Sequence, residues 1–128
     1  MMNTVQVALR VRPLLDFETE NGCESCLETF TDVQQVKISN NTFTFDYVFD
    51  QDVSQQAVYE LAVKKLILQL FKGLNVTVLA YGQTGSGKTY SIGTNNSWRI
   101  EEKGIIPRAV EEIFERVSSD QEWEYEIK

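Results

Sequence analysis

A glycine-rich run in this sequence has the residue types and the spacing of a phosphate-binding loop. It reads Gly82-Gln83-Thr84-Gly85-Ser86-Gly87-Lys88-Thr89 and fills every fixed position of the pattern G-x-x-x-x-G-K-[ST]. Glycines let such a loop wrap closely around a polyphosphate, because no Cβ separates the backbone N–H groups from the anion. Lys88 can then reach the β- and γ-phosphates, and the Thr89 hydroxyl can bind Mg²⁺. The run therefore predicts a site for a nucleoside triphosphate with magnesium.

The segments on either side of this run predict how the loop is held. Residues 76–81 are mostly apolar and include two valines, which predicts a buried strand. Residues 88–93 predict a short helix, whose N-terminal dipole would face the anion. A glycine-rich turn after a strand can also be only a turn, but the complete pattern between a strand and a helix favours nucleotide binding.

Alternating patterns predict further strands. Residues 5–11 alternate apolar and polar side chains and end at Arg12-Pro13, because proline cannot donate to a ladder. Residues 36–38 and 42–49 predict two strands joined at Ser39-Asn40-Asn41, where asparagine tolerates a positive φ. No basic residues are interleaved with the aromatic row of the second strand, so the row is assigned to the core: Phe43, Phe45, Tyr47 and Phe49. Residues 16–32 are polar and acidic and predict irregular structure.

Two long helices are also predicted. The first runs from its cap, Ser54, to about Lys72, and the second begins at residues 104–107 with Pro107 in its first turn. Their apolar stripes are Val58, Leu61, Ala62, Leu66, Leu70 and Phe71 in the first helix, and Ala109, Val110, Ile113, Phe114 and Val117 in the second. Residues 123–127 predict a half-buried strand. Because a domain rarely ends in mid-strand, we expect residues 1–128 to be the N-terminal part of a larger domain.

Composition argues against several classes of protein. The 128 residues are 42% hydrophobic and 24% charged, as in soluble proteins, and no apolar run approaches the roughly 18 residues of a membrane span. A net charge of −7 without a basic stripe argues against direct nucleic-acid binding by this segment. The N-terminus lacks the pattern of a signal peptide, which predicts an intracellular protein.

Cys23 and Cys26 form a lone C-x-x-C. Such a pair can be redox-active or half of a zinc site, but zinc takes four ligands, and the sequence has no second pair and no histidine. Two ordinary thiols are therefore the favoured interpretation. The absence of histidine also excludes Ser-His and Cys-His catalysis within this segment.

Taken together, these residues resemble the beginning of a kinesin motor domain, and most of all the kinesin-4 group. The matching stretches are Val7-Ala8-Leu9-Arg10-Val11-Arg12-Pro13-Leu14, Phe43-Thr44-Phe45-Asp46-Tyr47-Val48-Phe49-Asp50, Val58-Tyr59, residues 75–90 with the glycine-rich run, and Gly104-Ile105-Ile106-Pro107-Arg108. They follow one another in order along almost the whole chain. One small departure is Ser91-Ile92-Gly93, where Thr-Met-Gly is usual, and residues 94–103 fall where kinesins carry a loop that interrupts a helix.

The resemblance implies an α/β fold of the P-loop NTPase type, with a central mixed β-sheet flanked by helices. It implies an ATPase that moves along microtubules, with ATP and Mg²⁺ as ligands and Lys88 and Thr89 as catalytic residues. Arg10, Arg12 and Pro13 would lie along the adenine, and Tyr90 would stack on its other side, which suits a guanidinium plane and a phenol ring. A kinesin would work in the cytoplasm on the microtubule cytoskeleton, and would form a homodimer through a later coiled coil.

The resemblance also implies that much of the motor lies beyond residue 128: switch I, switch II and the microtubule-binding elements. Two alternatives remain at this point. One is another P-loop NTPase, such as a small kinase or GTPase, although those proteins usually carry the loop near the N-terminus. The other is a truncated nucleotide-binding or interaction fragment without motor activity.

Overall fold

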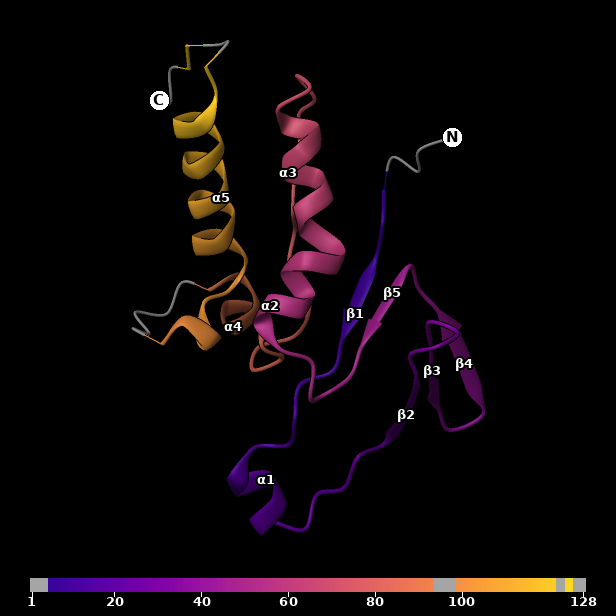
Figure 1. Cartoon of the computed structure of the whole chain (residues 1–128). Coiled ribbons are helices and arrows are strands. Elements are labelled where there is room, and N and C mark those ends of the chain that lie inside the picture. Colours follow the sequence, from indigo (N-terminus) through magenta and orange to yellow (C-terminus); the bar gives the residue numbers. More distant parts are fainter. Residues whose placement is uncertain (1–4, 94–98, 122–123, 126–128) are drawn as a thin grey trace. The chain divides into compact units, whose positions relative to one another are not determined.

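A computed structural model of the chain describes residues 5–93, 99–121 and 124–125. The chain divides into two compact units, residues 1–53 and 54–128. Every strand that the described residues form belongs to the first unit, and the second unit is built from helices and the segments between them (Figure 1). The elements together give the α/β composition that the sequence predicts.

The first unit contains two small sheets. Strand β1 (Ala8–Arg10) pairs in parallel with β5 (Tyr47–Phe49). Strands β2 (Leu27–Phe30), β3 (Gln35–Ile38) and β4 (Asn41–Thr44) form an antiparallel sheet in that order. Both kinds of pairing expected of a mixed sheet therefore occur, divided between two sheets. The strand predicted at residues 5–11 is present as β1, and the strand predicted at 36–38 is present as β3. The strand predicted at 42–49 is divided into β4 and β5, which belong to different sheets. The buried side chains of these strands are Val36, Val48 and Phe49.

The first unit differs from the prediction in three further places. Residues 16–32 are not irregular, because α1 (Asp16–Glu20) and β2 lie within them. Short elements of this kind are set by tertiary partners, here the ladder between β2 and β3, and leave little periodicity in the sequence. The aromatic row is core only at its end, since Phe49 is 3% exposed and Phe43 is 48% exposed. At the β3–β4 turn the positive φ falls on Ser39 and not on an asparagine.

The first long helix of the second unit is confirmed, with an interruption that the sequence did not predict. It consists of α2 (Gln55–Val58), a π-helical stretch η1 (Tyr59–Val63) and α3 (Lys64–Leu70). Ser54 caps it, because its hydroxyl accepts a hydrogen bond of 3.1 Å from the Ala57 N–H. The π-helical stretch changes the spacing of the buried stripe, which consists of Tyr59, Val63 and Ile67. Leu61 was predicted in this stripe but is 57% exposed.

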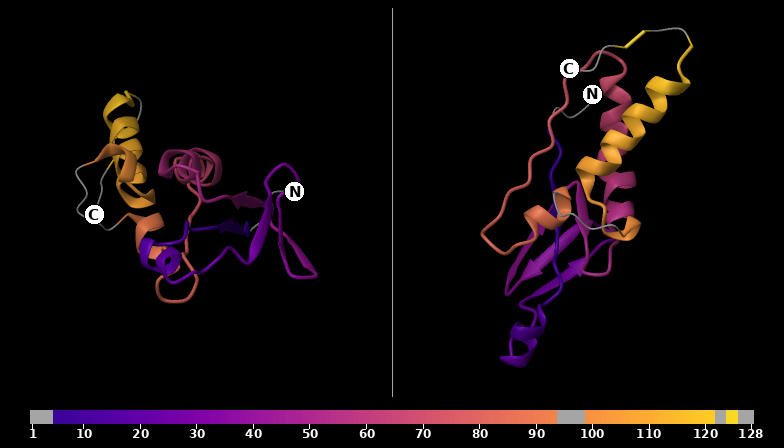
Figure 2. Two further views of the ribbon diagram at one scale, coloured as in Figure 1. Left: turned by 90° about the horizontal axis from the view of Figure 1, so that it is seen from below. Right: turned by 90° about the vertical axis from the view of Figure 1, so that its left-hand side faces the viewer.

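Three more helices complete the second unit: α4 (Lys88–Ile92), the 3₁₀ turn η2 (Ile100–Glu102) and α5 (Ile105–Ser119). Helix α5 runs alongside α3, as the two views of Figure 2 show. Its inner stripe packs on Tyr59, Val63 and Ile67 and consists of Ile105, Ala109 and Ile113. Val110 and Phe114 were predicted on the buried side but are about half exposed. The residues that face the cluster are the ones just before them in the sequence, Ala109 and Ile113.

The predicted strand at residues 76–81 is wrong for this structure. The segment is part of no ladder, and Leu79 and Tyr81 are 78% and 95% exposed. A strand requires a hydrogen-bonded neighbour, and this apolar run has none among the described residues. The predicted strand at residues 123–127 falls mostly outside the described residues, and Glu124 and Tyr125 are not in a strand. None of the described helices has the length and apolar character needed to cross a membrane.

Candidate functional site

The glycine-rich run forms a loop between the extended segment at 76–81 and helix α4. Gly82 has φ 150°, and a Cβ at this position would lie 2.6 Å from the Ser86 Oγ, so a larger residue would displace the serine. Gly87 takes φ 93° at the N-cap of α4, a conformation that favours glycine. The Ser86 N–H donates to the Gln83 carbonyl at 3.2 Å and closes the turn. These contacts explain why the loop requires glycine at its two ends.

Lys88 places a cation on this loop. Its Nζ donates to the carbonyl oxygens of Gly82 and Gln83, both at 2.7 Å. No carboxylate among residues 5–93, 99–121 and 124–125 forms an ion pair with it, although six other ion pairs occur there. The ammonium is therefore bound by neutral groups, and its charge remains available to an anion that enters the loop.

The other predicted contacts of this site lie on the same loop and helix. Gln83, Thr84 and Gly85 are exposed, and Ser86 and Gly87 are half-buried. Thr89 is exposed in the first turn of α4, so its hydroxyl is accessible to a hard cation such as Mg²⁺. Tyr90 follows in the same helix and is 47% exposed. In the described part of the chain, no three or more Cys, Asp or Glu side chains cluster as a metal site.

Arg10, Arg12 and Pro13 lie in the first unit. The Arg12 guanidinium binds the Glu18 carboxylate through two hydrogen bonds of 2.6 and 2.7 Å, and it donates to the Pro13 carbonyl at 2.9 Å. These bonds lie in the plane of the guanidinium and fix its orientation, while the flat face remains suited to stacking. Arg10 donates to the Val53 carbonyl at 3.2 Å. The structure thus brings these three residues together in one unit and brings the loop and Tyr90 together in the other.

The carboxyl group of Glu18, which pairs with Arg12, has a pKa well below its ordinary value. Hydrogen bonds from the Arg12 guanidinium and then from the Leu15 N–H lower the pKa of Glu18 to about 2. Because this lies below the ordinary value of 4.5, the pair stabilises the fold above that value, and the contribution is lost as the pH falls towards about 2. We expect an NMR titration of the Glu18 carboxyl group to have its midpoint near the lower value. A midpoint at the ordinary value would mean that the Arg12 pair does not form in solution.

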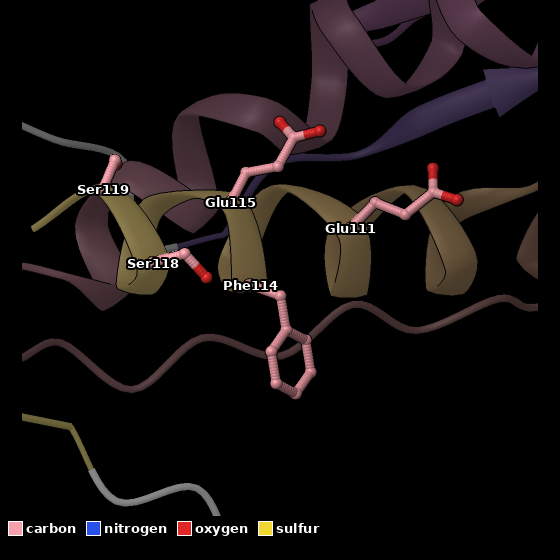
Figure 3. A pocket seen from close by; sticks show the side chains of 5 residues that line it. All are labelled: Glu111, Phe114, Glu115, Ser118 and Ser119. Atoms are coloured by element: carbon pink, nitrogen blue, oxygen red, sulfur yellow. The ribbon is translucent and has the colours of Figure 1, made fainter.

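Two other features of the surface do not belong to this site. Cys23 and Cys26 are free, exposed thiols. A shallow, open concavity of about 560 Å³ lies on α5, lined by Glu111, Phe114, Glu115, Ser118 and Ser119 (Figure 3). It contains no residue of the loop, and its two carboxylates would repel a phosphate.

Sequence reasoning missed Glu18, which orients Arg12. A signal for it exists, because a glutamate in the first turn of a helix often reaches back to the backbone N–H before that helix. Glu18 does so with the Leu15 N–H at 2.8 Å. The signal could be used only if residues 16–20 were recognised as a helix, and five residues are too few to show helical periodicity.

Comparison with known proteins gives the family of the chain. The kinesin motor domain family matches residues 10–128. The chain is 49% identical over 128 residues to the chromosome-associated kinesin KIF4 of Xenopus laevis, and the match covers 97% of this chain and 10% of that protein. It is 45% identical over 127 residues to the kinesin-like protein KIF27 of Homo sapiens, and the match covers 97% of this chain and 9% of that protein. The chain thus spans about a tenth of the length of these relatives, and it belongs to the kinesin motor domain family.

Proposed function

We propose that this chain is the ATP-binding part of a motor that couples ATP hydrolysis to movement along microtubules. The observation that carries the proposal is the Lys88 ammonium, held 2.7 Å from two carbonyls of a glycine-rich loop and paired with no described carboxylate. A cation in this position is suited to the β- and γ-phosphates of a nucleotide. Membership of the kinesin motor domain family supports the wider proposal of a microtubule motor.

The loop would bind the phosphates through its backbone and through Lys88. The backbone N–H groups between Gly82 and Gly87 would donate to the phosphate oxygens, as such loops do. Lys88 would exchange its bonds to the Gly82 and Gln83 carbonyls for bonds to phosphate oxygens, which are stronger because both partners are charged. Lys88 and Thr89 would thus be the residues of this chain closest to the reaction.

Magnesium fits this site as a partner of the nucleotide. Thr89 would contribute its hydroxyl, and phosphates and water would complete the coordination, since Mg²⁺ prefers oxygen ligands and keeps several waters. When bound, the ion would neutralise charge that develops on the phosphates.

The adenine contacts are proposed for Arg10, Arg12, Pro13 and Tyr90. Glu18 supports this role for Arg12, because it holds the guanidinium in one orientation through bonds within its plane. Tyr90 is about half exposed and follows the phosphate loop directly, so its ring is accessible to a base.

Hydrolysis requires more than this chain is proposed to supply. Phosphoryl transfer needs an oriented water and charge stabilisation in line with the scissile bond. Because the chain spans about a tenth of the length of its relatives, we propose that other parts of the full-length protein supply switch I, switch II, the microtubule contacts and a coiled coil for dimerisation. Such a protein would act in the cytoplasm on the cytoskeleton.

Steady-state turnover of the full-length protein tests this proposal. We expect ATP hydrolysis that microtubules accelerate, and a preference for ATP over both GTP and inorganic triphosphate if the base is contacted as proposed. Nucleotide binding without microtubule stimulation would favour a fragment or relative that lacks motor activity. A preference for GTP would favour a different class of P-loop NTPase.

A further inference from the structure

Gln55 is an unusual residue of the second unit, because it is polar and buried. It is the first residue of α2 and is 3% exposed, and it is the one polar side chain in the buried class among the described residues. Burying an amide is unfavourable unless its donors and acceptors are hydrogen-bonded. Its hydrogen-bond partners therefore identify what holds this side chain inside.

The Gln55 amide binds two backbone carbonyls that are far away in sequence. Its Nε2 donates to the Tyr90 carbonyl at 2.6 Å and to the Glu102 carbonyl at 3.3 Å. Tyr90 belongs to α4, which also carries Lys88, and Glu102 is the last residue of η2. One side chain thus connects α2 to the helix of the phosphate loop and to the turn that precedes α5.

A close contact between two glycines lies in the same region. A Cβ on Gly104 would lie 2.4 Å from the Gly93 nitrogen, and a Cβ on Gly93 would lie 2.5 Å from the Gly104 Cα. The backbones therefore meet directly just after α4 and just before α5. This contact and the two Gln55 bonds hold together the residues on both sides of segment 94–98.

Helix α4 needs such support. It has five residues, and a helix of this length is not stable by itself. The loss of backbone entropy on forming the first turn exceeds the stabilisation from that turn's hydrogen bonds. Lys88, Thr89 and Tyr90 can take fixed positions only if tertiary contacts hold the helix. The Gln55 amide makes such a contact directly to the helix backbone, two residues after Lys88.

We propose that Gln55 is a positioning residue of the nucleotide site, which fixes α4 and thereby Lys88 and Thr89. The proposal rests on the proposed nucleotide-binding function. Gln55 is not proposed to touch a phosphate, and it acts on the site through its hydrogen bonds to the Tyr90 and Glu102 carbonyls. Its loss should weaken nucleotide binding even when the protein stays folded.

The test compares three variants of the full-length protein. Gln55→Met keeps the length of the side chain and removes the donor, whereas Gln55→Glu places a carboxylate against two carbonyls. Gln56→Met is the matched control, because Gln56 is the exposed neighbour on the same helix. We expect Gln55→Met to weaken Mg·ATP binding about tenfold, the effect of one hydrogen bond to a buried group, and Gln55→Glu to weaken it further. Gln56→Met should bind Mg·ATP as the wild type does.

A pH series separates positioning from a general loss of structure. Burial at this position disfavours the carboxylate and raises the pKa of the introduced glutamate, and a protonated carboxyl group can donate where a carboxylate cannot. The defect of Gln55→Glu should therefore shrink as the pH falls from about 7.5 to about 5.5, relative to the wild type at each pH. The defect of Gln55→Met should not change. If Gln55→Met does not fold, Gln55→Asn replaces it. This variant keeps the amide but is too short to reach the two carbonyls, so we expect the same weakening of Mg·ATP binding and no change with pH.

The outcomes distinguish this proposal from the function on which it rests. Wild-type affinity in folded Gln55→Met and Gln55→Glu variants, while the wild type binds Mg·ATP, would overturn the role of Gln55 alone. Failure of the wild type itself to bind Mg·ATP would overturn the proposed function. A Gln55→Met variant that melts earlier but binds Mg·ATP normally when folded would make Gln55 a structural residue and would also overturn the proposal.

Discussion

Lys88→Ala should weaken Mg·ATP binding by the full-length protein about ten- to a hundredfold and abolish measurable turnover. The ammonium is the cation on the phosphate loop, and one charge-assisted hydrogen bond contributes roughly 1.5 to 3 kcal/mol. Equilibrium titration with a fluorescent ATP analogue measures the affinity, and phosphate release measures the turnover.

The variant should stay folded, because the bonds of the Lys88 ammonium within the described part of the chain go to two loop carbonyls, and Lys88 is not part of the cluster of Tyr59, Val63 and Ile67. Lys72→Ala is the matched control, since Lys72 is an exposed lysine in the turn after α3. Wild-type turnover in the Lys88→Ala variant would mean that the loop does not bind the phosphates. Equal loss in both variants would point to a general effect of charge.

Tyr59→Ala should lower the free energy of unfolding by about 3 to 5 kcal/mol, the range for truncating a buried aromatic side chain. Tyr59 is 4% exposed and belongs to the buried cluster that η1 and α3 form with α5. Its hydroxyl donates to Glu112 at 2.6 Å, and Arg116 donates to the same carboxylate at 2.8 and 3.0 Å. The truncation removes both the packing and one bond of this network. Urea denaturation followed by circular dichroism measures the change.

Tyr59→Phe separates the two contributions, because it removes only the hydroxyl. We expect a loss of about 1 to 3 kcal/mol, since Glu112 would keep Arg116 but lose a buried donor. Burial, and then the hydrogen bond to Glu112, raise the pKa of Tyr59, so the hydroxyl stays protonated and donates at neutral pH. Tyr81→Phe is the control, because Tyr81 is 95% exposed. Equal stability of the two phenylalanine variants would show that the Tyr59 hydroxyl contributes nothing to stability.

The sequence predicted the parts of the fold that depend on local signals. Ser54 caps the first long helix with its own hydrogen bond, and Pro107 lies in the first turn of α5. Elements that depend on distant partners were predicted less well. The run at 76–81 has the composition of a strand but no hydrogen-bonded neighbouring strand among the described residues. The π-helical stretch at Tyr59–Val63 shifts the buried stripe, because a prediction based on 3.6 residues per turn does not include the extra residue of a π-helical turn.

The candidate site divides in the same way. The pattern from Gly82 to Thr89 predicted a loop and a following helix, because the residues that determine this backbone conformation are neighbours in the sequence. Glu18 and Gln55 could not be found in this manner. Glu18 bonds to the side chain of Arg12, six residues away in the sequence. Gln55 bonds to the carbonyls of Tyr90 and Glu102, which are much farther away in the sequence. Such pairs become visible only when the fold brings them together.

Hydrogen–deuterium exchange of the full-length protein, with and without Mg·ATP, tests the central claim most directly. The claim is that the nucleotide phosphates bind the loop at residues 82–89. We predict that backbone amides of this loop and of α4 exchange more slowly in the presence of Mg·ATP, while the face of α5 that carries Glu111 and Glu115 is unchanged. Saturating Mg·ATP that leaves exchange at residues 82–92 unaltered, or that protects α5 instead, would contradict the account.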